Sequence, residues 1–180
     1  RGFAPAAWMW ALAPEKGRHF TTTDKRGIIM DRSEKTILTN MCMIFDDDGN
    51  ILVQDKKDEE WGGITFPGGH VENRESFTDA VIREIYEETG LIIEAPQICG
   101  IKQWQEEEDI RYVVLCYKTN RFKGQLKSSE EGDVYWMKLS HVREIPLARG
   151  MEHMLRVFLE DEVGEYYIYE DNGEWNHVLK

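Results

Sequence analysis

The chain has 180 residues, of which 41% are hydrophobic, and this is enough for one globular core. Its 34 acidic and 22 basic residues give a formal net charge of −12 at pH 7. That charge argues against a nucleic-acid-binding module, which needs a basic footprint. No apolar run reaches the roughly 18 residues that span a bilayer. We expect one soluble domain without a membrane partner, which must recruit cations if it handles phosphates.

The first 29 residues differ from the rest of the chain. The stretch from Phe3 to Ala13 is apolar and faintly similar to a signal peptide, but it has no initiating Met and no charged leader. Met30 is a natural start for a domain. We interpret residues 1–29 as an N-terminal extension without a part in the chemistry, and residues 30–180 as the functional domain.

The cysteines indicate a reducing compartment. Cys42, Cys99 and Cys116 are odd in number, far apart and set in apolar stretches. They show neither the spacing of a zinc site nor a disulfide framework. We expect them to be reduced core residues of a cytoplasmic protein.

The first predicted elements lead to a glycine pair. Residues 36–45 are β-branched and apolar, residues 46–50 are typical of a turn, and residues 51–55 resume the strand pattern. This succession predicts a hairpin. A short strand at 64–66 then runs into Pro67-Gly68-Gly69.

A helix is predicted directly after the glycine pair. Ser76 and Asp79 form a capping-box-like start, residues 77–88 contain no helix breaker, and Gly90 stands where a helix-terminating glycine belongs. Downstream, strands are predicted at 91–94, 98–105, 111–117 and 134–137, a helix at 150–159, and a hairpin at 166–169 and 175–179. This order predicts an α/β domain in which helices cover the faces of a mixed sheet.

The helix after the glycine pair carries charges on the face that should be buried. Phe77, Val81, Glu84 and Glu88 lie in one narrow stripe, with Glu87 beside it. An amphipathic helix normally places carboxylates opposite its apolar stripe. Buried carboxylates that repel each other are costly unless a cation pairs with them. Oxygen ligands favour Mg²⁺ or Mn²⁺ over zinc.

A solvated acidic patch is the alternative interpretation of these glutamates. The preceding glycine pair favours a metal site, because glycine lets a backbone carbonyl approach a metal and a phosphate without a Cβ between them. Neither feature alone indicates a site, since most Gly-Gly pairs are turns.

The segment that begins at Gly69 resembles the Nudix box, G-x5-E-x7-R-E-U-x-E-E-x-G-U with U an aliphatic residue. Every specified position matches, at Gly69, Glu75, Arg83, Glu84, Ile85, Glu87, Glu88, Gly90 and Leu91. The order of elements from about Ile37 to about Glu160 is also similar to that family. The resemblance implies an α/β/α sandwich that hydrolyses a nucleoside diphosphate linked to another moiety X, by attack of water on phosphorus.

The resemblance also assigns roles. Glu84 and Glu88 would be ligands of Mg²⁺, with Mn²⁺ as a substitute, Glu87 would be a third ligand or would hold a water of the metal, and the Gly69 carbonyl would complete the set. Glu84 or a downstream loop glutamate would accept the proton of the attacking water. Arg83 would orient a box glutamate through a salt bridge, and Glu75 would brace the loop. Glu130 or Glu131 aligns with an extra metal-binding glutamate.

The substrate is predicted from weaker signals. The Phe66-Pro67-Gly68-Gly69 entry and residues 133–136 are most similar to the MutT-type branch, which converts oxidised nucleoside triphosphates such as 8-oxo-dGTP to the monophosphate and pyrophosphate. In that branch Phe66 would lie against the base, and a plain core residue is the alternative. Gln54 and His70 stand where stronger phosphate ligands are found in the branch.

Other functions stay open as alternatives. Hydrolysis of ADP-ribose or another nucleotide sugar is one, although the proline that ADP-ribose-favouring branches tend to carry after the box is replaced here by Glu106-Glu107-Glu108. A non-catalytic, nucleotide-sensing module is another, and the intact box argues against it. Trp61 and Trp104 are candidates for a base slot or for the contact of a homodimer, with core packing as the alternative.

Overall fold

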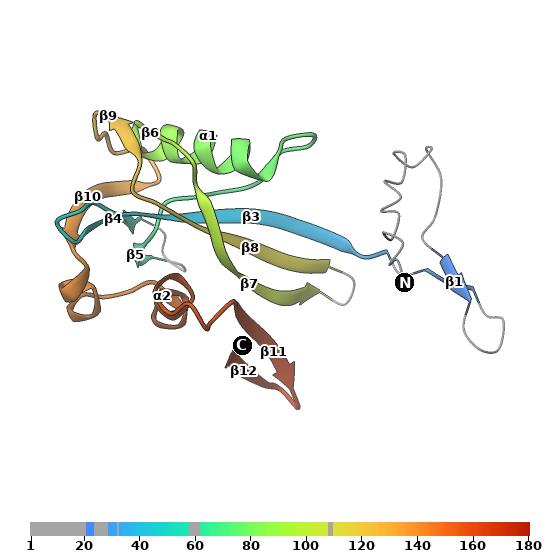
Figure 1. Ribbon diagram of the computed structural model, residues 1–180. Helices are drawn as coiled ribbons and strands as arrows, with labels where there is room; N and C mark the ends of the chain where they lie inside the picture. Colours follow the sequence, from blue (N-terminus) through green and yellow to red (C-terminus); the bar gives the residue numbers. More distant parts are fainter. Residues whose placement is uncertain (1–20, 24–28, 32, 58–61, 108–109) are drawn as a thin grey trace, which may run out of the picture. The chain divides into compact units, whose positions relative to one another are not determined.

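The computed structural model describes residues 21–23, 29–31, 33–57, 62–107 and 110–180 (Figure 1). The chain divides into two units, Arg1–Glu34 and Lys35–Lys180. In the first unit, β1 (Thr21–Thr23) pairs antiparallel with β2 (Ile29–Asp31). Most of the predicted extension, residues 1–29, lies outside the described residues. The fold and the site described below belong to the second unit.

Two sheets form the frame of the second unit. The larger is a mixed, five-stranded sheet in the order β12-β11-β7-β8-β3 among the described residues, with β3 (Lys35–Ile44), β7 (Gln97–Glu107), β8 (Ile110–Thr119), β11 (Glu165–Asp171) and β12 (Glu174–Leu179). The smaller joins β10 (Gly132–Lys138), β4 (Asn50–Lys56) and β5 (Gly63–Thr65) in antiparallel pairs. A further pair joins β6 (Leu91–Ile93) to β9 (Phe122–Gly124).

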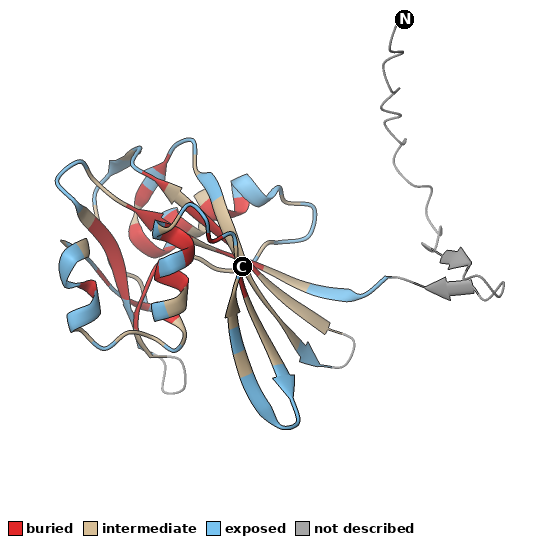
Figure 2. Ribbon diagram, turned by 60° about the horizontal axis from the view of Figure 1, so that its bottom comes forward, coloured by how far each residue is buried: buried red, intermediate tan, exposed pale blue. Residues whose placement is uncertain are grey.

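Two α-helices cover opposite faces of the larger sheet (Figure 1). The first, α1 (Phe77–Thr89), packs through Val81 and Ile85 into a core with Cys42 of β3 and Leu52 of β4. The second, α2 (Met151–Leu159), forms its own core with Met43 and other residues of the opposite face. A short 3₁₀-helix, η1 (Leu139–Glu144), precedes it. Buried segments of the ribbon lie on both helices and on strands of the two sheets (Figure 2). The expected α/β class is confirmed.

The predicted hairpin of residues 36–45 and 51–55 forms only at its turn, where Phe45 and Ile51 make one antiparallel bridge, and its strands do not pair further. The turn itself forms, because the Asp46 carboxylate accepts the backbone N–H groups of Asp48 and Asn50 at 3.0 and 2.8 Å. The strands on either side separate, however: β3 pairs in parallel with β8, whereas β4 pairs with β10 and β5. Residues 51–54 are buried on both faces of β4, which makes it a central strand.

The predicted ends of α1 are confirmed. Ser76 adopts an extended conformation, and its hydroxyl accepts the N–H of Asp79 at 3.0 Å. Gly90 ends the helix in the left-handed region, with its N–H donating to the Tyr86 carbonyl. One expectation for the buried stripe fails, because the first helical residue, Phe77, is 45% exposed. The stripe is buried only from Ala80 onward.

The cysteines are unpaired, as predicted, and Cys42 and Cys116 are buried. Burial raises the pKa of the half-buried Cys99 thiol to about 11. None of the described helices is long and apolar enough to cross a bilayer.

Replacing Gly90 by alanine is expected to destabilise the fold more than replacing Gly173. Both glycines have positive φ angles, 72° and 82°, where an L-residue costs about 1–2 kcal/mol. A Cβ at Gly90 would also lie 2.7 Å from the Gln125 carbonyl oxygen, whereas nothing lies within 4 Å at Gly173. Urea unfolding of both variants measures the difference, and equal losses would show that the contact at Gln125 carries no cost.

Candidate active site

The glycine loop lies antiparallel against the centre of β3. The Asn40 N–H donates to the Gly69 carbonyl at 2.8 Å, and the Cys42 N–H donates to the Pro67 carbonyl at 2.9 Å. The Val71 N–H donates to the Leu38 carbonyl at 2.9 Å. These backbone bonds fix the position of the glycine loop, and so the point from which the chain continues into α1. The Gly69 carbonyl, assigned to a metal by the resemblance, therefore already accepts one bond and retains one lone pair.

Both glycines of the loop are required by close approaches. Gly68 has a φ of 152°, and a Cβ there would stand under 3.0 Å from the Asn40 carbonyl oxygen. A Cβ on Gly69 would stand under 3.0 Å from the carboxylate of Glu84. The first glycine lets the loop pack on β3, and the second leaves room for a helix carboxylate beside the loop.

Glu88 is the most deeply buried carboxylate of the site, at 3% exposure. It accepts the Gly68 N–H at 2.8 Å, and its side chain also hydrogen-bonds with that of Glu131. Burial, together with the bond and charge of Glu131, raises the pKa of Glu88 to about 8, while the Gly68 amide and Lys56 act against this rise. A buried carboxylate that faces a second, exposed one therefore marks a place where a positive charge is favoured.

The structure places the two loop glutamates differently. Glu131 lies beside Glu88, with Lys56 Nζ 4.0 Å from its carboxylate. Glu130 instead lines an open groove on the outer side of α1, together with Glu87 and Tyr86. Of the two candidates from sequence, Glu131 is the one brought to the buried carboxylate.

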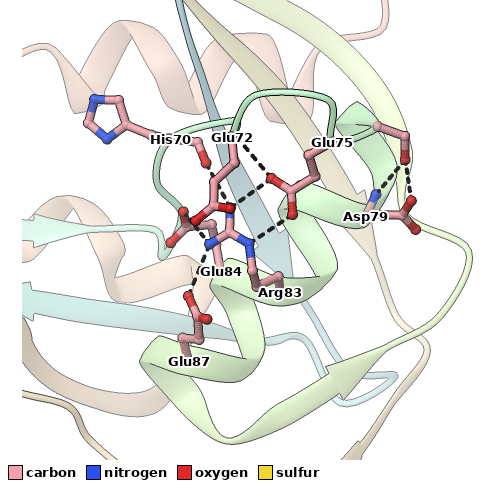
Figure 3. A network of polar contacts seen from close by, with 8 residues as sticks. His70, Glu72, Glu75, Asp79, Arg83, Glu84 and Glu87 are labelled. Atoms are coloured by element: carbon pink, nitrogen blue, oxygen red, sulfur yellow. Dashed lines mark hydrogen bonds and ion pairs between the residues drawn. The ribbon is translucent and has the colours of Figure 1, made fainter.

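Arg83 connects the loop to the helix through four acceptors (Figure 3). Its guanidinium binds Glu75 with two bonds of 2.8 Å, and its Nη1 bonds Glu84 at 2.9 Å and Glu87 at 3.0 Å. The fourth acceptor is the His70 carbonyl at 3.0 Å. The bond from Arg83 lowers the pKa of Glu75 to about 2, so this pair is charged at any physiological pH.

Two buried amides face the same region without partners. Within the part of the chain that the structure describes, neither side-chain atom of Asn40 has a hydrogen-bond partner, and nor does Gln54 Nε2. Strand alternation puts Gln54 on the same face of β4 as Leu52, which packs against α1. Buried polar groups of this kind are usually satisfied, so these orphans point to an absent ligand or water. Sequence reasoning missed Asn40, although a polar residue within an apolar strand was a visible signal.

The remaining candidates lie on the other side of the sheet or at the surface. Phe66 is 2% exposed and packs edge to face on Phe158, with ring centroids 5.0 Å apart, so the alternative of a core residue fits its position. His70 is exposed, 6.5 Å from the ring of Tyr112. Trp104 stacks on Tyr112 at 4.2 Å. Trp61 lies outside the described residues.

The glutamates of the site have the right donor atoms for a divalent cation, but their side chains are not arranged as a coordination shell. Among the described residues, no three His, Cys, Asp or Glu side chains are already arranged as a coordination group. Arg83 instead holds the carboxylates of Glu84 and Glu87, and Glu131 shares a hydrogen bond with Glu88. The donors are all oxygens, which suits Mg²⁺ or Mn²⁺.

Comparison with known proteins shows the family of the chain. The model of the NUDIX domain matches residues 35–158. The uncharacterized Nudix hydrolase YvcI of Bacillus subtilis is 30% identical over 126 residues, which cover 67% of this chain and 78% of that protein. An ADP-ribose pyrophosphatase of Methanocaldococcus jannaschii is 31% identical over 90 residues, which cover 49% of this chain and 53% of that protein.

Solved structures show the same architecture. The MutT protein of Bacillus halodurans superposes with a TM-score of 0.67 and 26% identity, over 80% of this chain and 97% of that one. The box lies within the matched region, and its carboxylates gather where the glycine loop meets α1. The chain belongs to the Nudix family and is a MutT-like hydrolase of phosphorus-containing acid anhydrides.

Proposed function

We propose that the chain cuts a diphosphate bond of a nucleotide with the help of divalent cations, Mg²⁺ or Mn²⁺, held by Glu84, Glu88 and Glu131. The observation that carries this proposal is the buried Glu88 carboxylate, which faces Glu131 although burial and repulsion oppose its charge. A cation relieves both penalties. When bound, it would neutralise the phosphate and make an attacking water more acidic.

The surrounding side chains would orient this site. Arg83 fixes Glu84 and Glu87 from one guanidinium nitrogen, while Glu75 locks Arg83 in place. Glu84 is the candidate acceptor of the water's proton, with Glu131 as the loop alternative. Phosphoryl transfer asks a protein mainly for positioning and charge neutralisation, which this network is built to supply.

The proposed substrate is an oxidised nucleoside triphosphate such as 8-oxo-dGTP, converted to the monophosphate and pyrophosphate in sanitation of the nucleotide pool. The likeness to the MutT protein of Bacillus halodurans over 97% of that chain supports it. Hydrolysis of ADP-ribose is the second candidate, supported by the archaeal pyrophosphatase, of which this chain spans about half. The unpaired cysteines support our proposal of a cytoplasmic location.

Product chromatography tests the function directly. Purified protein with Mg²⁺ is offered 8-oxo-dGTP, dGTP, ADP-ribose and a dinucleoside polyphosphate, with EDTA as the control. We expect 8-oxo-dGMP and pyrophosphate as the preferred products, and no turnover in EDTA. Preference for ADP-ribose would overturn the substrate, and turnover that survives EDTA would overturn the metal. Failure to cut any of the four would favour a nucleotide-sensing module.

Replacing Gly69 by alanine is expected to lower kcat by about tenfold or more. The new Cβ would stand under 3.0 Å from the Glu84 carboxylate and displace it, and a misplacement of about 1 Å costs up to about a hundredfold. Gly164 has open space around it and serves as the matched control. An unchanged kcat of the Gly69→Ala variant at saturating metal would show that the Glu84 carboxylate can move without loss of activity, and would contradict this prediction.

A further inference from the structure

A cavity of about 570 Å³ opens on the α2 face of the larger sheet. Lys56 lies on its lining, and the Nζ of the same lysine is 4.0 Å from the carboxylate of Glu131. The cavity and the carboxylate site therefore meet at Lys56. A substrate whose diphosphate lies at the carboxylates can reach the cavity with another part of the molecule.

One wall of the cavity comes from the C-terminal hairpin of β11 and β12. This hairpin lies beyond residues 35–158, which the NUDIX domain covers. It joins the sheet because β11 pairs in parallel with β7, with Tyr166 opposite Lys102 and Ile168 opposite Trp104. Tyr166 and His177 of the hairpin line the cavity. This wall therefore lies outside the segment that the family model matches.

The aromatic rings of the cavity stack on one another. Trp104 stacks on Tyr112 with centroids 4.2 Å apart and an angle of 14° between the planes. Tyr166, His153 and His177 form a cluster of stacked rings with centroids 5.0 to 5.8 Å apart, and the Tyr166 hydroxyl shares a 2.5 Å hydrogen bond with His177 Nδ1. Because these faces are largely occupied, they form a rigid apolar floor rather than an open slot for a base.

Among the residues that the structure describes, the groups that face the cavity without a counter-charge are two cations, Lys102 and Arg149. Lys102 Nζ lies 4.8 Å from the Trp104 ring and 5.8 Å from the Tyr166 ring. Neither Lys102 nor Arg149 forms an ion pair with any carboxylate among the described residues. Glu106 is the only carboxylate of the described lining, and it accepts the Trp104 indole N–H. Burial lowers the pKa of Lys102, and Arg149 lowers it further.

Gly150 keeps the space between these groups open. It adopts a φ of 81° at the start of α2 and lines the cavity. A Cβ at this position would lie 3.4 Å from the Tyr166 hydroxyl and 3.9 Å from Lys102 Nζ. Any larger residue would fill the place in which a small ligand group contacts both.

We propose that Lys102 and Arg149 form a second phosphate subsite, which binds a phosphate group of the substrate outside the scissile diphosphate. A desolvated ammonium beside a guanidinium binds a phosphate through charge-assisted hydrogen bonds, and the apolar floor strengthens them. In a chain of net charge −12, a local pair of cations also focuses anions into the cavity. The proposal rests on the proposed function in one respect: the scissile diphosphate of the substrate must lie at Glu84 and Glu88.

Two sources of such a phosphate can be distinguished with ligand pairs that differ by one phosphate. 8-oxo-dGTP and 8-oxo-dGDP differ in the terminal phosphate of the chain, and NADP⁺ and NAD⁺ differ in a phosphate on a sugar. The preference is the ratio of kcat/KM within each pair. In the wild-type enzyme we expect at least one pair to favour the more phosphorylated member by about tenfold or more, because hydrogen bonds to charged groups have that effect.

Three variants test which side chains carry the preference. Lys102→Met keeps the length of the side chain and removes its charge, and it should lower the ratio by about tenfold. Arg149→Gln should lower the ratio by a smaller factor, since Arg149 is exposed. Arg143→Gln removes a charge from exposed surface outside the cavity lining and should leave the ratio unchanged. Arg149→Gln keeps the test decisive if Lys102→Met fails to fold.

Calorimetric Kd values for the same four ligands, measured with Ca²⁺ in place of Mg²⁺ so that the carboxylates stay neutralised while turnover is suppressed, separate this proposal from the proposed function. Tighter binding of a phosphorylated member, weakened by Lys102→Met, supports the subsite even if no ligand is hydrolysed. Hydrolysis with no preference within either pair overturns the subsite and leaves the hydrolase intact. Equal losses for both members of a pair in the variants also overturn it.

Discussion

The 2.8 Å hydrogen bond from the Gly68 amide to the Glu88 carboxylate joins the glycine loop to the last turn of α1. Because the Glu88 side chain is buried, its surroundings disfavour the negative charge that this hydrogen bond stabilises. The loop can make this bond because its backbone bonds to β3 and because Gly68 tolerates the approach of Asn40. Glu88 therefore connects the glycine loop, β3 and α1. Its negative charge in turn needs a positively charged partner.

The protein separates its charges across the larger sheet. Acidic groups gather on the α1 face, where Glu88 and Glu131 repel each other and favour a cation, and Glu84 lies beside Gly69 of the same glycine loop. On the α2 face, Lys102 and Arg149 border a cavity with a single carboxylate among its described lining residues. Lys56 belongs to both places. Under the two proposals, a phosphate-bearing molecule would be attracted by the cations of the cavity directly and by the carboxylates only through a bound metal, as an acidic chain that handles anions requires.

Local signals in the sequence predicted local structure well. Ser76 and Gly90 marked both ends of α1, because capping depends on a few neighbouring residues. The hairpin prediction failed since its turn signal is local, whereas the pairing of β3 with β8 involves residues 75 positions apart, as in Lys35 with Ile110. Spacing on the helix predicted that Glu84 and Glu88 share one face, and both lie at the glycine loop, but the choice between the candidates Glu130 and Glu131 needed the fold. The cavity of Lys102 and Tyr166 has no sequence signature because its walls meet only in the sheet.

Binding of Mn²⁺ to the protein, measured from the electron spin resonance signal of the free ion, tests the account most directly. The Glu88→Gln variant keeps the volume of the side chain and removes its charge, and Glu152→Gln on the exposed face of α2 is the control. We expect the wild type and the control to bind Mn²⁺ equally, and Glu88→Gln to bind it about tenfold more weakly or worse. Equal affinity in all three folded proteins would contradict the metal site at Glu88.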